Sequence, residues 1–313
     1  MTSFLIALGA ITPFMIYLGF GYLARVIGLA EEPFLNKLNT VVFKCFFPFL
    51  MFWNLYNVDG GLHVDGKYLA ICVGSLLLLI LVLCLTVPRL VKDRDKQSVI
   101  IQAAYRSNFV LFGIPMAESL VGSKGAALAT VTVAIIVPLY NAIAVILFEH
   151  YRGGDVNLPR LVLNVLKNPL IMGALIGLAF LLLGIHLPGP LEKPVHAFSD
   201  LTTPLAMFVL GGTLHFSAIR ANRRYIWPVL GFKLLLLPLL ATLVSALLDL
   251  SSAERVVLLI MSGAPVAVSS YTMAANMGGD GELAGQYVFI STVVSLFTLF
   301  LFFYTYHATG FIA

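Results

Sequence analysis

Long apolar stretches alternate along this chain with short segments that hold most of its charged residues, prolines and glycines. An α-helix needs about 20 mostly apolar residues to cross the hydrocarbon layer of a membrane. The pattern therefore predicts an all-α integral membrane protein with ten transmembrane helices. Their expected ranges are 4–27, 33–56, 68–88, 98–121, 126–149, 168–186, 190–216, 225–248, 254–277 and 283–306.

The basic residues between these helices predict the orientation of the chain, because cytoplasmic loops hold an excess of Lys and Arg. We therefore expect the odd-numbered loops in the cytoplasm and both termini outside, in a multi-pass protein of the bacterial inner (plasma) membrane. The odd-numbered connections hold Arg25, Lys37, Arg89, Lys92, Arg94, Lys96, Arg152, Arg160, Lys167, Arg220, Arg223 and Arg224, and the even-numbered ones hold Lys67, Lys124, Lys193 and Arg255.

Composition supports a lipid environment. Hydrophobic residues make up 60% of the chain and charged residues only 11%, whereas soluble domains carry about a quarter charged residues. The net charge of +4 comes from 19 basic and 15 acidic residues, which are too dispersed to favour nucleic acid as a partner. The sequence shows no ligand spacing typical of a metal site and no motif of a hydrolase, so we expect no metal, no cofactor and no enzymatic activity.

The two halves of the chain contain an internal repeat. Because five helices per half is an odd number, the two copies would insert in opposite orientations. We expect one transmembrane domain over residues 1–313, made of inverted five-helix repeats at about 1–152 and 160–313. At an offset of 156 the matches are Pro13 with Pro169, Gly21 with Gly177, Gly28 with Gly184, Pro48 with Pro204, Met51 with Met207, Phe52 with Phe208, Gly122 with Gly278 and Gly125 with Gly281, and at an offset of 150 Gly113-Ile114-Pro115 matches Gly263-Ala264-Pro265.

Prolines near the middle of helices 4 and 9 predict broken helices. Pro115 and Pro265 have no N–H and clash with the carbonyl four residues back, so we expect breaks around Gly113 and Pro115 and around Gly263 and Pro265, with the two helices crossing there. The restarting half-helices would point their free N–H groups and positive dipole ends at the bilayer centre, an arrangement that binds anions. Ordinary proline kinks, satisfied by neighbouring helices, are the alternative.

Four stretches of the sequence, in combined order and spacing, resemble the auxin efflux carrier family. The resemblance spans nearly the whole chain and implies secondary transport of small organic anions, mono- or dicarboxylates, by an elevator-type motion. It also implies that helices 1, 2, 6 and 7 form a scaffold, which often forms a homodimer. The stretches are Ser107 to Pro115, Asn168 to Ile171, Thr203 to Gly212, and Gly263 to Pro265 leading to Ala274-Ala275-Asn276.

The resemblance also implies a substrate site. Asn108, seven residues before Pro115, occupies the position of an Asn that contacts the substrate carboxylate in this family. The backbone after the second proline contributes as well, at Ala267 and Val268. Ser269 and Tyr271 follow this break and are further candidates to line the cavity. Met51 replaces a small polar residue of the plant exporters, which argues against auxin as the substrate.

Charged residues inside the apolar stretches have alternative roles. Arg106 could clamp a carboxylate with its planar guanidinium, although extension toward the cytoplasm is the commoner behaviour. Glu118 either binds a coupling ion or lies near the outer mouth. Lys44 and Asp200, related by the offset of 156, are expected to form a structural ion pair rather than a proton relay. Lys233 either complements an anionic substrate or pairs elsewhere.

Related carriers and a different class of protein are the alternatives. Coupling to H⁺ or Na⁺ is left open, and a sodium-coupled symporter of the bile-acid type shares the expected architecture. A cation/proton antiporter does so too, but helices 5 and 10 offer no Asp or Glu in their interiors. A membrane receptor or scaffold is the non-transport alternative, and it would not need two broken helices.

Overall fold

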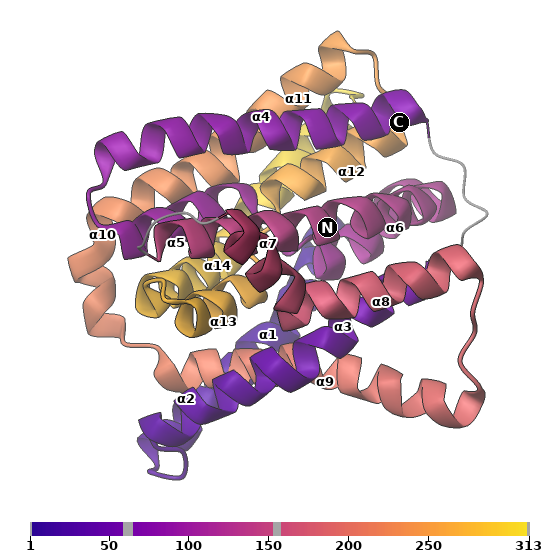
Figure 1. Ribbon diagram of the computed structural model, residues 1–313. Helices are drawn as coiled ribbons and strands as arrows, with labels where there is room; N and C mark the ends of the chain where they lie inside the picture. The colour runs from indigo at the N-terminus through magenta and orange to yellow at the C-terminus, as the bar shows by residue number, and fades with distance from the viewer. Residues whose placement is uncertain (1, 59–64, 153–157, 312–313) are drawn as a thin grey trace.

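The computed structural model of the protein describes residues 2–58, 65–152 and 158–311. Within these ranges the regular elements are all helical (Figure 1). The two chain ends, Met1 and residues 312–313, lie outside the described residues. The helices are α1 (Thr2–Val26), α2 (Glu32–Val41), η1 (Val42–Phe46), α3 (Phe47–Tyr56), α4 (Gly66–Leu90), α5 (Arg94–Tyr105), α6 (Phe109–Tyr151), α7 (Leu158–Lys167), α8 (Pro169–Leu183), α9 (Gly189–Thr213), α10 (Phe216–Gly231), η2 (Phe232–Leu236), α11 (Leu237–Leu247), α12 (Ser252–Gly263), α13 (Val268–Met277) and α14 (Gly281–Ala308), of which η1 and η2 are π-helical.

Several of these helices are long and apolar enough to cross a membrane. Large apolar side chains are exposed on their surfaces, for example Leu78 (62%) and Phe297 (61%), as expected of helices whose outer faces contact lipid rather than water. The fold is therefore that of an all-helical integral membrane protein. Five continuous helical stretches satisfy the length and composition of a span: Glu32–Tyr56, Gly66–Leu90, Phe109–Tyr151, Ala218–Leu247 and Gly281–Ala308.

Helix boundaries follow local capping chemistry. At the start of α12, the Ser251 hydroxyl accepts from the N–H of Glu254, whose carboxylate accepts in return from Ser251. Asn168 caps α8 by accepting from the N–H of Leu170, and Pro169 occupies the first helical position. Both arrangements satisfy N–H groups that have no partner inside the helix.

Helix α6 bends sharply at Val121 and Gly122, so it consists of two arms. Gly122 has φ 71°, a left-handed conformation that glycine adopts without strain. The first arm, residues 109–120, corresponds to the end of the expected span 98–121, and the second arm contains the expected span 126–149. The beginning of the expected span 98–121 lies in α5.

Two pairs of helices pack in backbone contact, α1 with α9 and α3 with α8. A Cβ atom at Gly21 would overlap the carbonyl oxygen of Phe208, and one at Gly177 would lie 2.6 Å from the carbonyl oxygen of Phe52. Small residues permit such close packing in membrane proteins. We call α1, α2, η1, α3, α8 and α9 the scaffold group, and α4, α5, α6 and α10 to α14 the core group. Figure 1 shows α2, α3, α8 and α9 on one side of the molecule and α4, α11 and α12 on the opposite side.

Candidate functional site

The first helix break lies before the predicted position. α5 ends at Tyr105, Arg106 has an extended conformation (φ −85°, ψ 123°), and α6 begins at Phe109. Pro115 lies inside α6, and Gly113 packs against the ring of Phe109. The prediction of a break around Gly113 and Pro115 is therefore wrong.

Long-range pairing explains why the chain breaks at Arg106–Asn108 instead. Ser107 forms an antiparallel bridge with Val266, and the Asn108 N–H donates to the carbonyl of Pro265 at 2.7 Å. These contacts satisfy backbone groups that would otherwise be unpaired at membrane depth. Pro115 removes only one helical hydrogen bond, and it does so at an exposed position.

The second break lies where it was predicted. α12 ends at Gly263, Ala264 is extended (φ −63°, ψ 152°), and α13 begins at Val268. Because Pro265 has no N–H, the carbonyl of Met261 has no helical partner, and the hydroxyl of Ser107 donates to it at 2.6 Å. Each break thus completes the hydrogen bonding of the other.

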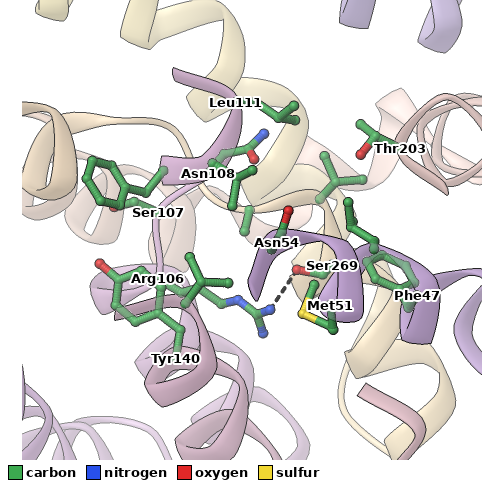
Figure 2. Close-up of a pocket in the computed structure, with 16 residues that line it drawn as sticks. Phe47, Met51, Asn54, Arg106, Ser107, Asn108, Leu111, Tyr140, Thr203 and Ser269 are labelled. Carbon is green, nitrogen blue, oxygen red and sulfur yellow. Dashed lines mark hydrogen bonds between the residues drawn. The ribbon is translucent and has the colours of Figure 1, made fainter. Parts of the chain in front are cut away.

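A small cavity of about 50 Å³ lies beside the two breaks, between the scaffold group and the core group. We call it the crossing cavity (Figure 2). Among its lining residues are the predicted Asn108, Ala267, Val268 and Ser269. The others are Phe47, Leu50, Met51, Asn54, Arg106, Ser107, Phe109, Val110, Leu111, Val137, Tyr140 and Thr203.

Tyr271 does not line this cavity. Its hydroxyl hydrogen-bonds with Thr213 at 2.7 Å, and it borders a separate cavity together with Glu32 and Glu282. On α13, Ser269 faces the crossing cavity, whereas Tyr271, two residues further on, points in a different direction because successive helical residues are rotated by about 100°.

Arg106 is buried at the edge of the crossing cavity, with 2% of its surface exposed. Its guanidinium donates to Ser269 Oγ at 2.7 Å, to Met273 Sδ at 2.8 Å and to Asn141 Oδ1. Figure 2 shows the side chain reaching toward Ser269, with Met51 and Asn54 nearby. The prediction that Arg106 extends toward the cytoplasm is wrong, because neutral acceptors on α6 and α13 hold the guanidinium inside the protein.

Further hydrogen-bond donors converge on the same cavity. The amino-terminal ends of α6 and α13 border it, and neither end has a side-chain cap among the described residues. Within that same part of the chain, the side-chain amide of Asn108 makes no hydrogen bond, and the buried Nδ2 of Asn54 has no partner. Uncapped helix starts, free amides and a guanidinium together form a site that can bind an anion.

Among the side chains that the structure describes, buried charge is positive. The buried charged residues in that set are Arg106 and Lys233, and no Asp or Glu is among them. A buried cation without an acidic neighbour is costly unless an anion arrives to compensate it. The site therefore suits a negatively charged ligand better than a cation.

The remaining predicted residues lie elsewhere. Glu118 is exposed on the first arm of α6 and does not line the crossing cavity. Lys44 and Asp200 are both exposed, and Asp200 pairs with His196 at 3.3 Å. The predicted Lys44–Asp200 ion pair is wrong, because a histidine one helical turn away on α9 is the nearer partner.

Sequence reasoning missed two polar residues that the scaffold group contributes, Asn54 and Thr203. A signal for both existed. Asn54 is three residues after Met51 and so shares its face of the helix, and Thr203 stands directly before Pro204 at the start of a stretch that carries the family resemblance. A polar side chain inside an apolar span is a candidate for function.

Known transporters match this chain over most of its length. A transporter of Methanothermobacter thermautotrophicus, described as uncharacterized, is 27% identical over 281 residues, which cover 89% of this chain and 91% of the relative. A second uncharacterized transporter, from Methanocaldococcus jannaschii, is 23% identical over 293 residues, covering 90% and 92%. The family model described as "Membrane transport protein" matches residues 6–303. The chain therefore belongs to the membrane transport protein family, which is the auxin efflux carrier family that its sequence resembles.

Proposed function

We propose that this protein is a secondary transporter of small organic anions, mono- or dicarboxylates, and that the crossing cavity is its binding site. The observation that carries the proposal is the buried guanidinium of Arg106, whose partners are all neutral, beside two uncapped helix starts. A carboxylate would supply the missing counter-charge and accept from the guanidinium and from backbone N–H groups.

The volume of the cavity supports a small ligand. About 50 Å³ is room for only a few water molecules, since one water needs roughly 10–15 Å³ by this measure. A carboxylate group fits such a space. Asn108 and Asn54 offer amide groups for its oxygens, and Phe47 and Leu111 line the apolar part.

The helices support the proposed count of ten spans in one domain. Helix 4 is α5 with the first arm of α6, helix 5 is the second arm, and helix 9 is α12 with α13. The other spans are α1 for helix 1, α2–η1–α3 for helix 2, α4 for helix 3, α8 for helix 6, α9 for helix 7, α10–η2–α11 for helix 8 and α14 for helix 10.

Matched glycines support the proposed inverted repeats at about 1–152 and 160–313. Gly122 and Gly278 both have positive φ, as do Gly28 and Gly184. The contact of Gly21 with Phe208 is repeated as the contact of Gly177 with Phe52, with every residue shifted by 156. The two breaks, at residues 106–108 and 264–267, are also separated by close to 156 residues. The match of Gly113-Ile114-Pro115 with Gly263-Ala264-Pro265, at an offset of 150, therefore does not identify the corresponding positions of the two breaks.

The position of the cavity supports an elevator-type mechanism. Asn54 and Thr203 come from the scaffold group, whereas Arg106, Asn108 and Ser269 come from the core group. Sliding of the core group past a fixed scaffold would carry the anion across the membrane. We further propose that the scaffold group forms a homodimer, through helices 1, 2, 6 and 7, in a bacterial inner membrane with both termini outside.

Uptake by reconstituted vesicles tests the proposed function. The full chain is inserted into lipid vesicles, and uptake of labelled pyruvate, malonate and succinate is measured with and without Na⁺. We expect saturable uptake of at least one of them, and Asn108→Ala should abolish it. Asn57→Ala, at an exposed position after α3, is the matched control and should retain uptake.

Two results would contradict this proposal. Unchanged uptake by Asn108→Ala, with normal expression and a single peak on gel filtration, would exclude the crossing cavity as the site. No uptake and no binding of any of the three acids by the unmodified protein would exclude the substrate class. Dependence on Na⁺ would favour the sodium-coupled symporter over the proton-coupled or uncoupled carrier.

A further inference from the structure

A second buried cation, Lys233, lies directly behind the first helix break. Lys233 belongs to the π-helical segment η2. Such segments are rare in proteins overall, and those that occur are often found at functional sites. The exposed fraction of Lys233 is 0%. Its Nζ contacts the hydroxyl of Ser107. Lys233 itself does not line the crossing cavity, but Ser107 does, so one hydroxyl group separates the amine from the cavity.

In the described part of the chain, Lys233 forms no ion pair with an acidic side chain. η2 packs against α5, α10, α11, α12 and α14. Tyr105 of α5 and Tyr287 of α14 are buried, but their hydroxyls donate to the carbonyls of Tyr140 and Tyr225. The charged residues of these elements otherwise lie at their ends or on exposed faces: Arg94, Asp95, Lys96, Arg220, Arg223, Arg224, Glu254, Arg255 and Glu282. Arg106, at the end of α5, adds a like charge.

The two buried cations differ in what they can do with a proton. The guanidinium of Arg106 stays charged under all ordinary conditions, whereas a lysine amine can exist in a neutral form when it is buried. With the guanidinium of Arg106 on the residue before Ser107 and without a carboxylate, an ammonium at Lys233 is costly while the cavity is empty. An anion in the cavity removes part of that cost, because it attracts the guanidinium directly and the ammonium across Ser107.

We propose that Lys233 is a proton-binding site coupled to anion binding, an inference that rests on the proposed function. As an anion enters the crossing cavity, a proton from the surrounding solution enters with it as hydronium. The Ser107 hydroxyl turns from the Met261 carbonyl to the amine, gives its proton to the amine lone pair and takes one from the hydronium, which leaves as water. The ammonium that forms compensates the anion, and the proton returns to water when the anion leaves. The carrier is then an anion/proton symporter, which moves a monovalent anion together with about one proton.

The proposal can be tested directly, because binding of the anion and binding of the proton are thermodynamically linked. If anion binding promotes proton uptake, a lower pH must raise the anion affinity by the same factor. Calorimetric titration of the full chain with pyruvate, malonate and succinate, in two buffers of different ionisation enthalpy, counts the protons. At about pH 7.5 these carboxylates are fully ionised, so protons taken up then belong to the protein. We expect the unmodified protein to take up a substantial fraction of one proton for each anion bound.

Three variants separate proton binding from a structural role. Lys233→Arg keeps the charge but cannot release its proton, so it should bind the anion without proton uptake, and an inward proton gradient should no longer stimulate vesicle uptake. Lys233→Met removes both the charge and the proton, and should bind more weakly with no dependence on pH. Lys44→Met is the matched control, because Lys44 also lies in a π-helical segment but is exposed; it should behave like the unmodified protein.

The outcomes distinguish the two proposals. Anion binding by the unmodified protein without proton uptake would overturn the role of Lys233 and leave the proposed function intact, as would unchanged proton uptake in Lys233→Arg. Failure of all three acids to bind would overturn the proposed function and this inference with it. If Lys233→Met does not fold, proton counting on the unmodified protein and on Lys233→Arg still decides the question.

Discussion

The two helix breaks perform the same structural task with different residues. The first, Arg106-Ser107-Asn108, consists of three polar side chains, and all three line the crossing cavity. The second, Ala264-Pro265-Val266-Ala267, carries no side-chain hydrogen-bonding group. The first break contributes side-chain donors, whereas the second contributes backbone geometry. The comparison shows that two interruptions which satisfy each other's backbone groups can present different chemistry to one cavity, polar side chains from the first and backbone from the second.

The largest expected effect concerns the side chains of the first break. Arg106→Met removes the guanidinium, and since hydrogen bonds to charged groups are worth about 1.5–3 kcal/mol each, we expect anion affinity to fall about 100-fold. Arg106→Lys should recover only part of this loss, because an ammonium cannot make the planar two-pronged contact. Calorimetric titration with the acid that binds best among pyruvate, malonate and succinate measures the change.

Arg89→Met is the matched control for this substitution, because Arg89 is exposed at the end of α4. Its anion affinity should equal that of the unmodified protein. Equal affinity in Arg106→Met would show that the first break does not supply the recognition.

An intermediate effect is expected at Pro265, the proline of the second break. Pro115, inside α6, is the proline with which it is compared. Pro265→Ala restores an N–H that can donate to the Met261 carbonyl in competition with Ser107, so α12 can extend and disturb the crossing. We expect about a tenfold loss of affinity. Pro115→Ala, inside α6 and away from the cavity, should change affinity by less than about twofold and should not lower the melting temperature, because an interior proline costs a helix about 3 kcal/mol relative to alanine.

Affinity and thermal unfolding of both variants, measured in detergent, decide this comparison. A larger loss of affinity for Pro115→Ala than for Pro265→Ala would mean that the prolines, rather than the pairing between the breaks, determine where the helices are interrupted.

The smallest expected effect concerns Lys96 in the first turn of α5, which pairs with Asp280, just before α14, at 3.0 Å and with Asp93 at 3.2 Å. Lys96 and Asp93 precede the expected span 98–121, and Asp280 lies between the expected spans 254–277 and 283–306. The hydrogen bond to Asp280 raises the pKa of Lys96 above its ordinary value. The stabilisation is therefore fully present below the ordinary lysine pKa of about 10.4 and is lost as pH rises through the raised pKa. Because both side chains are partly exposed, the pair is worth less than about 1 kcal/mol.

Melting temperatures of Lys96→Met and of the unmodified protein should accordingly differ slightly at neutral pH and converge as pH rises through the raised pKa of Lys96. Lys92→Met, at an exposed position just before α5, is the control and should show no difference at either pH. A difference for Lys96→Met that grows at high pH would mean that the ion pairs of Lys96 with Asp280 and Asp93 do not stabilise the folded protein through the lysine charge.

The sequence allowed much of the fold to be predicted because membrane helices follow simple rules. Apolar length identified helices that are long enough to cross a membrane, and capping residues such as Ser251 and Asn168 explain where helices begin. The second break could be predicted as well, since Pro265 removes a hydrogen bond that only a long-range partner can replace. For the candidate site, the family spacing brought Asn108, Ala267 and Val268 to one cavity.

What failed depended on contacts between distant segments. The first break lies at Ser107 because that residue pairs with Val266, and no local pattern reports this pairing. Arg106 was expected to extend to the cytoplasm, but Ser269 and Asn141, from two other helices, retain it. The expected partner of Asp200 came from the repeat, whereas the actual partner, His196, comes from the same helix.

The hydrogen bonds exchanged between the two breaks also constrain how such a chain can diversify over evolution. An insertion that lengthens either interruption would leave backbone groups of the other unpaired, so we expect neither loop to tolerate one. On the function proposed above, changes of cargo would have to arise at Arg106, at Asn108 and at the facing positions Asn54 and Thr203, whose side chains take no part in these backbone hydrogen bonds.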